Sequence, residues 1–254
     1  MWPVIVIALN TFRENLRDKI LYNLVFSSLL LIGASVLLAD LTIMEHHKMI
    51  ADMGLAAINL VGVIIAVFVG IGLVSKEIER RTIYTIMARP IKRTQFVLGK
   101  YLGLVMTLSV NMAVMVIVFF ATLWLYRAPI HGALMQAVAL IFVEVLVVTA
   151  IALFFSTFST STLSAIMTLG LFVVGHLTVD LKGIAESSRS EMVQAVVTTV
   201  YYVFPNLEIL NVKGQAAMGV HVSYAYQAMA TSYGLLYAAL LLAGACVIFQ
   251  RRDF

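Results

Sequence analysis

The sequence predicts an all-α, polytopic membrane protein with six transmembrane helices. Of its 254 residues, 62% are hydrophobic and 12% are charged, and the mean hydropathy is +1.00. A soluble domain carries about 25% charged and about 45–50% apolar residues, so this composition excludes a soluble globular protein. The apolar residues also lie in long runs, and a helix of about 20 such residues crosses the roughly 30 Å hydrocarbon core of a bilayer.

Six apolar runs are long enough to be membrane-spanning helices. They are residues 20–39, 55–74, 97–126, 133–155, 163–179 and 224–249. The third run is long enough to project from the membrane at its basic end, and the length of the sixth permits tilt or an extension into water. Because no repeat or low-complexity linker separates the runs, we predict a single domain over residues 1–254.

An even number of spans places both termini on one side, and the basic residues predict which side that is. Of the 17 Lys and Arg residues, 12 lie on the side of the termini: Arg13, Arg17, Lys19, Lys76, Arg80, Arg81, Arg89, Lys92, Arg93, Lys100, Arg251 and Arg252. The other five are Lys48, Arg127, Lys182, Arg189 and Lys213. Cytoplasmic loops are enriched in Lys and Arg, so we predict a cytoplasmic (inner) membrane protein with both termini in the cytoplasm.

The N-terminal residues 1–19 are predicted to form an interfacial helix. Ile5, Leu9, Phe12 and Leu16 share one helical face, and polar residues lie on the other. The first basic residue is Arg13, whereas a cleaved signal has a basic region before its apolar run, so we expect this helix to be retained.

Two further segments lie between the spans. Residues 75–96 form the largest predicted cytoplasmic segment, and a helix in it should break near Arg89-Pro90 because proline disfavours helical geometry at the preceding residue. On the outer side, residues 180–223 contain an apolar stretch, 192–204, that is too short to span and is predicted to be interfacial or re-entrant.

The sequence lacks the motifs of a nucleotide-binding or catalytic protein. A P-loop reads GxxxxGKS or GxxxxGKT, but the Gly99-Lys100 pair has Thr94 at the first glycine position and Tyr101 after the lysine. If ATP drives this protein, another subunit must bind it. Nothing in the sequence supports an enzyme, and the adjacent His46 and His47 on a predicted short outer loop do not complete a metal site.

The loop before the third span resembles that of a known family. Glu77, Thr82, Arg89-Pro90, Arg93 and Gly99-Lys100 resemble the cytoplasmic loop of type-2 ABC transporter permeases, the membrane subunits of bacterial exporter-type ABC transporters. The N-terminal helix, six spans, long outer segment and Arg-Arg-Asp-Phe ending extend the resemblance over essentially the whole chain. Arg81 departs from it, since the family often has glycine there.

The resemblance implies a coupling helix seated in a groove of a separate ATPase subunit, which binds ATP and Mg²⁺, while this chain binds no cofactor. It also implies a second permease subunit, as a homodimer or heterodimer in the bilayer, and no nucleic-acid partner. Ile83, Ile86 and Met87 would form an apolar docking ridge. The full set of expected coupling residues is Glu77, Glu79, Arg80, Thr82, Ile83, Ile86, Met87, Arg89, Pro90 and Arg93. The alternative is a solvated basic loop that contacts anionic lipid.

Glu144 lies in the middle of the fourth span, where a carboxylate costs about 2.5–3.5 kcal/mol on insertion scales. It therefore faces the bundle interior, a partner or a water cavity. It either lines the translocation route or joins helices through a hydrogen bond, for which Asn111 is a candidate partner.

In the outer segment, the resemblance implies a re-entrant gate, which here would be formed by Tyr201, Tyr202, Phe204 and Pro205. The alternative is an interfacial aromatic anchor.

Two other functions of the whole chain remain open at this point. One is a mechanical transmission module that acts on an outer-side partner without translocating substrate, and the other is an integral-membrane enzyme.

Overall fold

The computed structural model describes residues 2–39, 46–79, 92–187 and 191–251, and every regular element in these ranges is a helix. This confirms the all-α prediction. Six helices in the described residues are long and apolar enough to cross a membrane, as predicted: α2 (Lys19–Ala39), α3 (His46–Glu79), α5 (Arg93–Leu125), α6 (Gly132–Ser156), α7 (Ser161–Ser187) and α10 (Tyr224–Arg251). The shorter elements are α1 (Trp2–Asn15), α8 (Glu191–Val203), the 3₁₀ helix η1 (Glu208–Leu210) and α9 (Lys213–Ala217).

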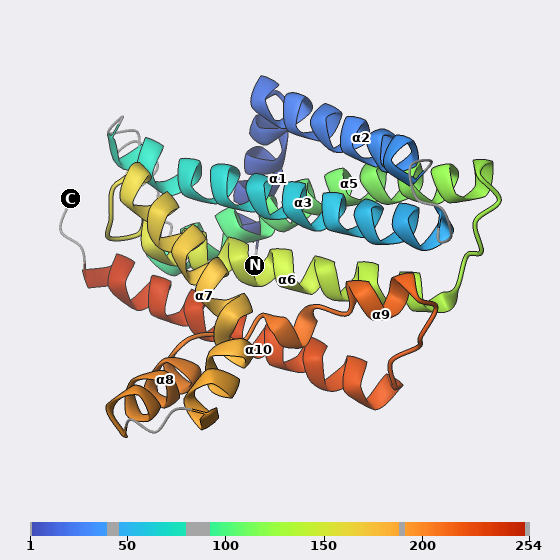
Figure 1. The fold of residues 1–254 in the computed structure, drawn as a ribbon. Coiled ribbons are helices and arrows are strands. Elements are labelled where there is room, and N and C mark those ends of the chain that lie inside the picture. Colours follow the sequence, from blue (N-terminus) through green and yellow to red (C-terminus); the bar gives the residue numbers. More distant parts are fainter. Residues whose placement is uncertain (1, 40–45, 80–91, 188–190, 252–254) are drawn as a thin grey trace.

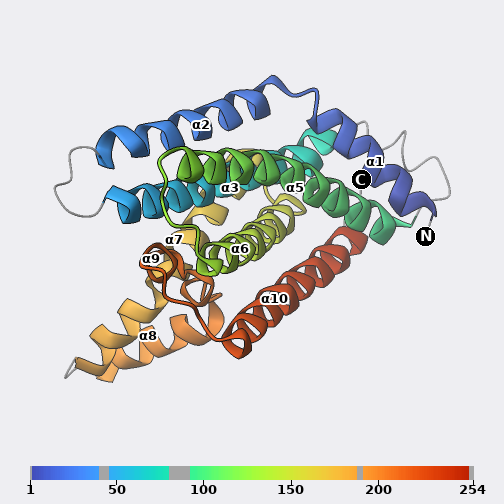
Figure 2. The ribbon, with the colours of Figure 1, turned by 90° about the vertical axis from the view of Figure 1, so that its right-hand side faces the viewer.

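Two helices form the centre of the bundle. Helix α6 packs against α3, α10, α7 and α5, and α3 also packs against α2 (Figures 1 and 2). The apolar windows of α3 and α6 are each 72% buried, whereas those of the other four spans are 22–39% buried. Helix α6 is apolar on all sides, as expected for a helix surrounded by protein. The other spans leave apolar faces uncovered, which is stable only next to lipid or another protein.

The N-terminal helix α1 lies along the first turns of α5 and crosses the direction of the long helices (Figure 1). Two glycines of α5 allow this close approach. A Cβ at Gly99 would lie 2.8 Å from the Ile7 side chain, and one at Gly103 would lie 2.7 Å from the Ala8 carbonyl oxygen. The Gly-xxx-Gly spacing therefore brings two helix backbones together.

Two helices are longer than their predicted apolar spans. Helix α3 begins at His46 rather than near Leu55, and α7 continues to Ser187 rather than ending at Val179. The placement of His46 and His47 in a loop was therefore wrong. Hydropathy locates only the apolar part of a helix, whereas backbone hydrogen bonding continues into polar sequence until a residue breaks it.

The segment between α7 and α10 is built from short elements. Helix α8 lies beside α7, and together they project from the bundle (Figure 1). Apolar stretch 192–204 is thus largely helical and too short to span. The chain then returns to the bundle, where η1 contacts α7, α10 and α6, and α9 contacts α3 and α6.

Candidate functional site

The predicted coupling segment lies between the end of α3 and the start of α5. Glu77 and Glu79 occupy the last turn of α3, and Arg93 is the first residue of α5. The other predicted coupling residues lie outside the described residues: Arg80, Thr82, Ile83, Ile86, Met87, Arg89 and Pro90. The structure therefore describes where the segment leaves and rejoins the bundle.

At the point of return, Arg93 contacts the C-terminal end of α10. Its Nη1 donates to the carbonyl oxygens of Phe249, at 3.2 Å, and Gln250, at 3.0 Å. The last carbonyls of a helix have no partner within the helix, and the negative end of the helix dipole favours a cation there. The family resemblance predicted a role for Arg93 towards the ATPase, but no sequence pattern indicates Phe249 as its partner, because the two residues are 156 positions apart.

Aromatic packing strengthens the same contact. The Phe96 ring stacks on Phe249, with centroids 5.7 Å apart and planes inclined by 14°, and both side chains are fully buried. The Gln95 Oε1 atom accepts a hydrogen bond of 3.2 Å from the Lys92 backbone N–H, which satisfies a donor at the start of α5. The first turn of α5 is thus fixed to the end of α10.

On its other side, the start of α5 is joined to α1. Lys100 is buried, with Nζ 4.0 Å from the Glu14 carboxylate and 5.7 Å from the centroid of the Phe96 ring. About two helical turns further along α5, Asn15 Nδ2 donates to the Thr107 hydroxyl at 3.3 Å. We term α1, the first half of α5 and the end of α10 the basal junction. A displacement of the first turn of α5 would reach all three helices together.

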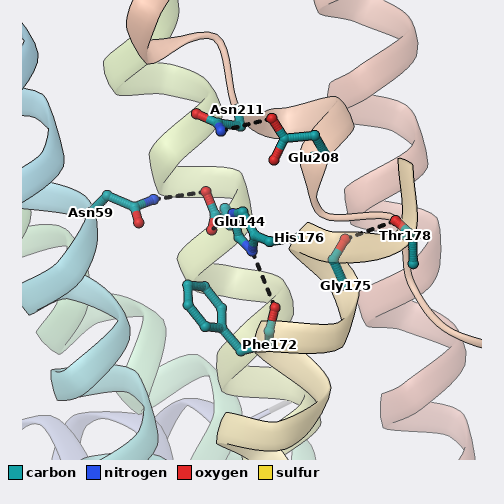
Figure 3. A network of polar contacts seen from close by, with 8 residues as sticks. All are labelled: Asn59, Glu144, Phe172, Gly175, His176, Thr178, Glu208 and Asn211. Carbon is teal, nitrogen blue, oxygen red and sulfur yellow. Dashed lines mark hydrogen bonds and ion pairs between the residues drawn. The ribbon is translucent and has the colours of Figure 1, made fainter. Parts of the chain in front are cut away.

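The second candidate site lies in the middle of the bundle around Glu144. Its side chain is fully buried on α6, and its Oε2 accepts a 2.7 Å hydrogen bond from Asn59 Nδ2 of α3. Its Oε1 lies 3.2 Å from His176 Nε2 of α7 (Figure 3). His176 Nδ1 in turn lies 3.1 Å from the Phe172 carbonyl oxygen. We term Asn59, Glu144 and His176 the polar triad.

The contacts of His176 determine how protons are distributed in the polar triad. A carbonyl oxygen only accepts hydrogen bonds, so Nδ1 must carry a proton. The contact between Nε2 and Oε1 then requires one more proton, on either the imidazole or the carboxyl group. Both arrangements leave the pair with no net charge, which avoids the high cost of an isolated charge in a low-dielectric interior. Proton transfer between Glu144 and His176 converts a neutral pair into an ion pair, or the reverse, without changing the net charge of the site.

Asn111 does not occupy the predicted position beside Glu144. Its Nδ2 donates at 2.7 Å to the Thr107 carbonyl one turn earlier in α5, so the amide expected to reach Glu144 is engaged within its own helix. The proposed Asn111–Glu144 contact is thus replaced by contacts to Asn59 and His176. Asn59 and His176 are polar residues inside apolar runs, but no sequence pattern indicates that they contact Glu144.

The predicted gate residues lie at the end of α8 and just after it. Tyr201 and Phe204 are partly buried, Pro205 is buried, and the Tyr202 side chain lies outside the described residues. The next residues are tied to two spans, because the Asn206 N–H donates to the Tyr233 hydroxyl at 2.9 Å and the Leu207 N–H donates to the Gly175 carbonyl at 3.0 Å. Pro205 thus lies where α7 and α10 hold the returning chain.

Comparison with known proteins identifies a family for this fold. The family described as ABC-2 family transporter protein matches residues 5–254, which include all six spans, the polar triad and all but the first residues of the basal junction. No curated protein matches the chain in a sequence comparison. Members of the family are membrane permease subunits of ABC transporters, which work with an ABC ATPase. The chain belongs to the ABC-2 family of transporter proteins.

Proposed function

We propose that this chain is the permease subunit of an ATP-driven exporter in the cytoplasmic membrane, with both termini in the cytoplasm. A separate ATPase subunit binds ATP and Mg²⁺ and docks on residues 75–96. The observation that carries the proposal is the family match over residues 5–254. The chain itself is a transport subunit without catalytic residues.

In this proposal, Ile83, Ile86 and Met87 enter a groove of the ATPase, and Glu79, Arg80 and Arg89 surround them. Closure of two ATPase subunits around ATP pushes the segment against the bundle. The basal junction supports this role because the Arg93 and Phe96 contacts fix the start of α5 to α10, and Gly99 and Gly103 pack it on α1. The spans then rock as connected bodies.

The substrate path lies between two permease subunits, either identical or different. The exposed apolar faces of α2, α7 and α10 support the need for a neighbour, although lipid covers part of them. Glu144 belongs to an intramembrane polar site that links three helices, and Asn111 lies on the adjacent α5. Tyr201, Tyr202, Phe204 and Pro205 form the outer gate.

The first experiment is affinity purification of the tagged chain in mild detergent, followed by identification of its partners and an ATPase assay. We expect a subunit with a P-loop to co-purify, and Arg89→Glu to reduce its permease-dependent hydrolysis. Arg127→Glu is the matched control, because it reverses the same charge on an exposed residue of the α5–α6 loop. Purification of the chain without an ATPase, under conditions that preserve other ABC complexes, would overturn the proposal.

A second test concerns the docking ridge. Ile83→Asp and Met87→Asp place carboxylates where apolar contacts are expected, so coupled ATPase activity should be lost while membrane insertion is retained. Unchanged coupling in both variants would exclude docking through this ridge and favour the lipid-contacting alternative.

A further inference from the structure

Gly175 of α7 lies between the polar triad and the returning chain, which we define as residues 205–207. The residue that follows it, His176, belongs to the triad (Figure 3). Towards the returning chain, a Cβ at position 175 would lie 2.8 Å from the Pro205 carbonyl oxygen and 2.9 Å from the Leu207 side chain. Real Cβ atoms essentially never come within 3.0 Å of another heavy atom, and a backbone carbonyl cannot rotate away, so this approach requires glycine.

The other glycines of α7 have no such neighbour. At Gly170 and at Gly183, a Cβ would have no heavy atom within 4 Å. Alanine forms helices more readily than glycine does, so a glycine inside a helix is explained where a neighbour needs the space. Gly175 meets that condition, and Gly170 offers a matched control on the same helix.

A backbone hydrogen bond joins α7 to the returning chain at the same point. The Leu207 N–H donates to the Gly175 carbonyl oxygen at 3.0 Å, and Leu207 is fully buried. The Thr178 hydroxyl, which is also fully buried, donates to the same oxygen at 3.0 Å (Figure 3). A buried donor that loses its partner carries the full cost of desolvation. The returning chain is therefore held on α7 as long as α7 keeps its place.

The returning chain and the Glu144 carboxyl group have a common support in α6. Glu144 is part of α6, and η1, which directly follows the returning chain, packs on α6 and α10. The Asn206 N–H adds a hydrogen bond of 2.9 Å to the Tyr233 hydroxyl of α10. A movement of α7 away from α6 thus separates Gly175 from the returning chain and His176 from Glu144 in the same step, because Gly175 and His176 are consecutive in one helix.

We infer that Gly175 is a positioning residue that couples the outer segment to the polar triad, so that α7 leaves Glu144 only when the returning chain is released. The hydrogen bond between His176 and Glu144 then holds the outer segment in place, and its loss loosens that segment. The inference rests on the proposed function in one respect, because the part released is the proposed outer gate, which ends at Pro205. Coupling between two sites acts equally in both directions, and the experiment tests each direction.

The first direction is tested from the polar triad, with the full chain in phosphatidylcholine nanodiscs. His176→Leu removes the contact of α7 with Glu144, and hydrogen exchange resolved to single residues then follows the Leu207 amide. This amide exchanges only when its hydrogen bond to Gly175 opens. We expect its exchange to become about tenfold faster, which is the effect of losing roughly one hydrogen bond.

Asn59→Leu is the matched control for His176→Leu. It removes the other hydrogen bond of the same carboxyl group and leaves the contact with α7 in place. The exchange of the Leu207 amide in this variant should stay within about twofold of the wild type, as for sites that do not interact. Unchanged exchange in His176→Leu, or equal acceleration in both variants, would overturn the inference.

The second direction is tested from the returning chain. Gly175→Ala places a Cβ against the Pro205 carbonyl, whereas Gly170→Ala places one in open space. Nitrogen NMR signals of the histidine-labelled chain report the tautomer and hydrogen bonding of His176, whose signal is the one that moves in Glu144→Gln. We expect this signal to move in Gly175→Ala and to keep its position in Gly170→Ala. An unmoved signal in Gly175→Ala, or equal movement in both variants, would overturn the inference.

The two glycine variants keep all three side chains of the polar triad, so the NMR measurement decides the matter even if His176→Leu does not fold. Neither measurement involves transport or an ATPase. Failure of the coupling would therefore leave the proposed permease function standing, and purification of the chain without an ATPase would overturn that function while leaving the coupling intact.

Discussion

The basal junction and the polar triad join helices in different ways. The basal junction combines close backbone packing at Gly99 and Gly103, an aromatic stack, and a guanidinium bound to carbonyl groups. The polar triad consists of two side-chain contacts to one buried carboxyl group, and one of them depends on the position of a proton. The first arrangement resists relative movement of helices through packed contacts, whereas the second is broken by small displacements of α7.

This difference suggests a division of roles. We infer that the basal junction moves as one body when the coupling segment is displaced, and that the polar triad is where α7 separates from α3 and α6. The burial of the spans agrees with this, because α7 has the least buried apolar window, at 22%, and the two helices it would leave have the most buried ones. The following substitutions test the contrast.

The largest effect is expected at Glu144. Glu144→Ala removes the acceptor of Asn59 and the partner of His176 and leaves a cavity, so stability should fall by about 3 kcal/mol or more. The measurement is chemical or thermal unfolding of the purified chain in detergent. Glu144→Gln is the control, because its amide oxygen still accepts from Asn59 and its amide N–H donates to a neutral His176. Equal stability of Ala and Gln variants would show that the triad does not hold the helices together.

Glu144→Gln also distinguishes a structural role of Glu144 from a role in the transport cycle. It retains the volume and the hydrogen bonds but cannot exchange a proton with His176. Loss of transport in a variant that assembles and unfolds like the wild type would assign the shared proton to the transport cycle. Normal transport would leave Glu144 with a structural role.

At the basal junction, the largest effect is expected at Gly103. Gly103→Leu forces a side chain against the Ala8 carbonyl and Thr11, so we expect a loss of about 1–3 kcal/mol and separation of α1 from α5. Gly170→Leu on α7 is the matched control, since nothing lies within 4 Å of a Cβ there. Fluorescence-detected thermal unfolding should show a lower Tm for the first variant only. An unchanged Tm for Gly103→Leu would mean that α1 is not packed as described.

A smaller effect is expected at Arg93. Arg93→Ala leaves the Phe249 and Gln250 carbonyls to solvent or lipid headgroups, and partial exposure limits the cost to about 1 kcal/mol. Hydrogen exchange should become faster in the last turn of α10. The exchange rate in Arg93→Lys should lie between those of the wild type and of Arg93→Ala, because an ammonium group does not reproduce the planar arrangement of guanidinium donors. If hydrogen exchange in Arg93→Ala became faster in α5 and stayed unchanged in α10, this would contradict the contact between Arg93 and α10.

The smallest effect is expected at Asn111. Its amide bonds to its own helix, so Asn111→Ala should cost less than about 1 kcal/mol, whereas Asn59→Ala removes a donor from a buried carboxyl group and should cost about 1.5–3 kcal/mol. The same unfolding measurement compares the two. A larger loss of stability in Asn111→Ala than in Asn59→Ala would support the contact between Asn111 and Glu144 that was predicted from the sequence.

The spans were predictable because membrane insertion depends on local composition. Each apolar run is read from consecutive residues, and the cost of exposing backbone polar groups to lipid makes each one a helix. The ends of α3 and α7 were less predictable, since polar residues such as His46 and Ser187 extend a helix without extending its apolar run.

The candidate sites were predictable only in part. The cost of a carboxyl group inside a span identified Glu144 as a residue with a partner, but the identity of that partner depends on helix rotation and depth. Asn59 and His176 lie 85 and 32 positions from it, and no local pattern relates them. The contact of Arg93 with α10 is hidden for the same reason.

The central position of α3 and α6 also determines how the sequence can vary. Apolar residues on the outward faces of α2, α7 and α10 are exposed, so one apolar residue can replace another there without disturbing the packing within the chain. In α6, side chains such as Leu140, Ile151 and Leu153 are fully enclosed by other helices, and a change of one methylene group alters the packing. A saturation library should therefore tolerate apolar exchanges on the three outer helices and select for side-chain volume along α6.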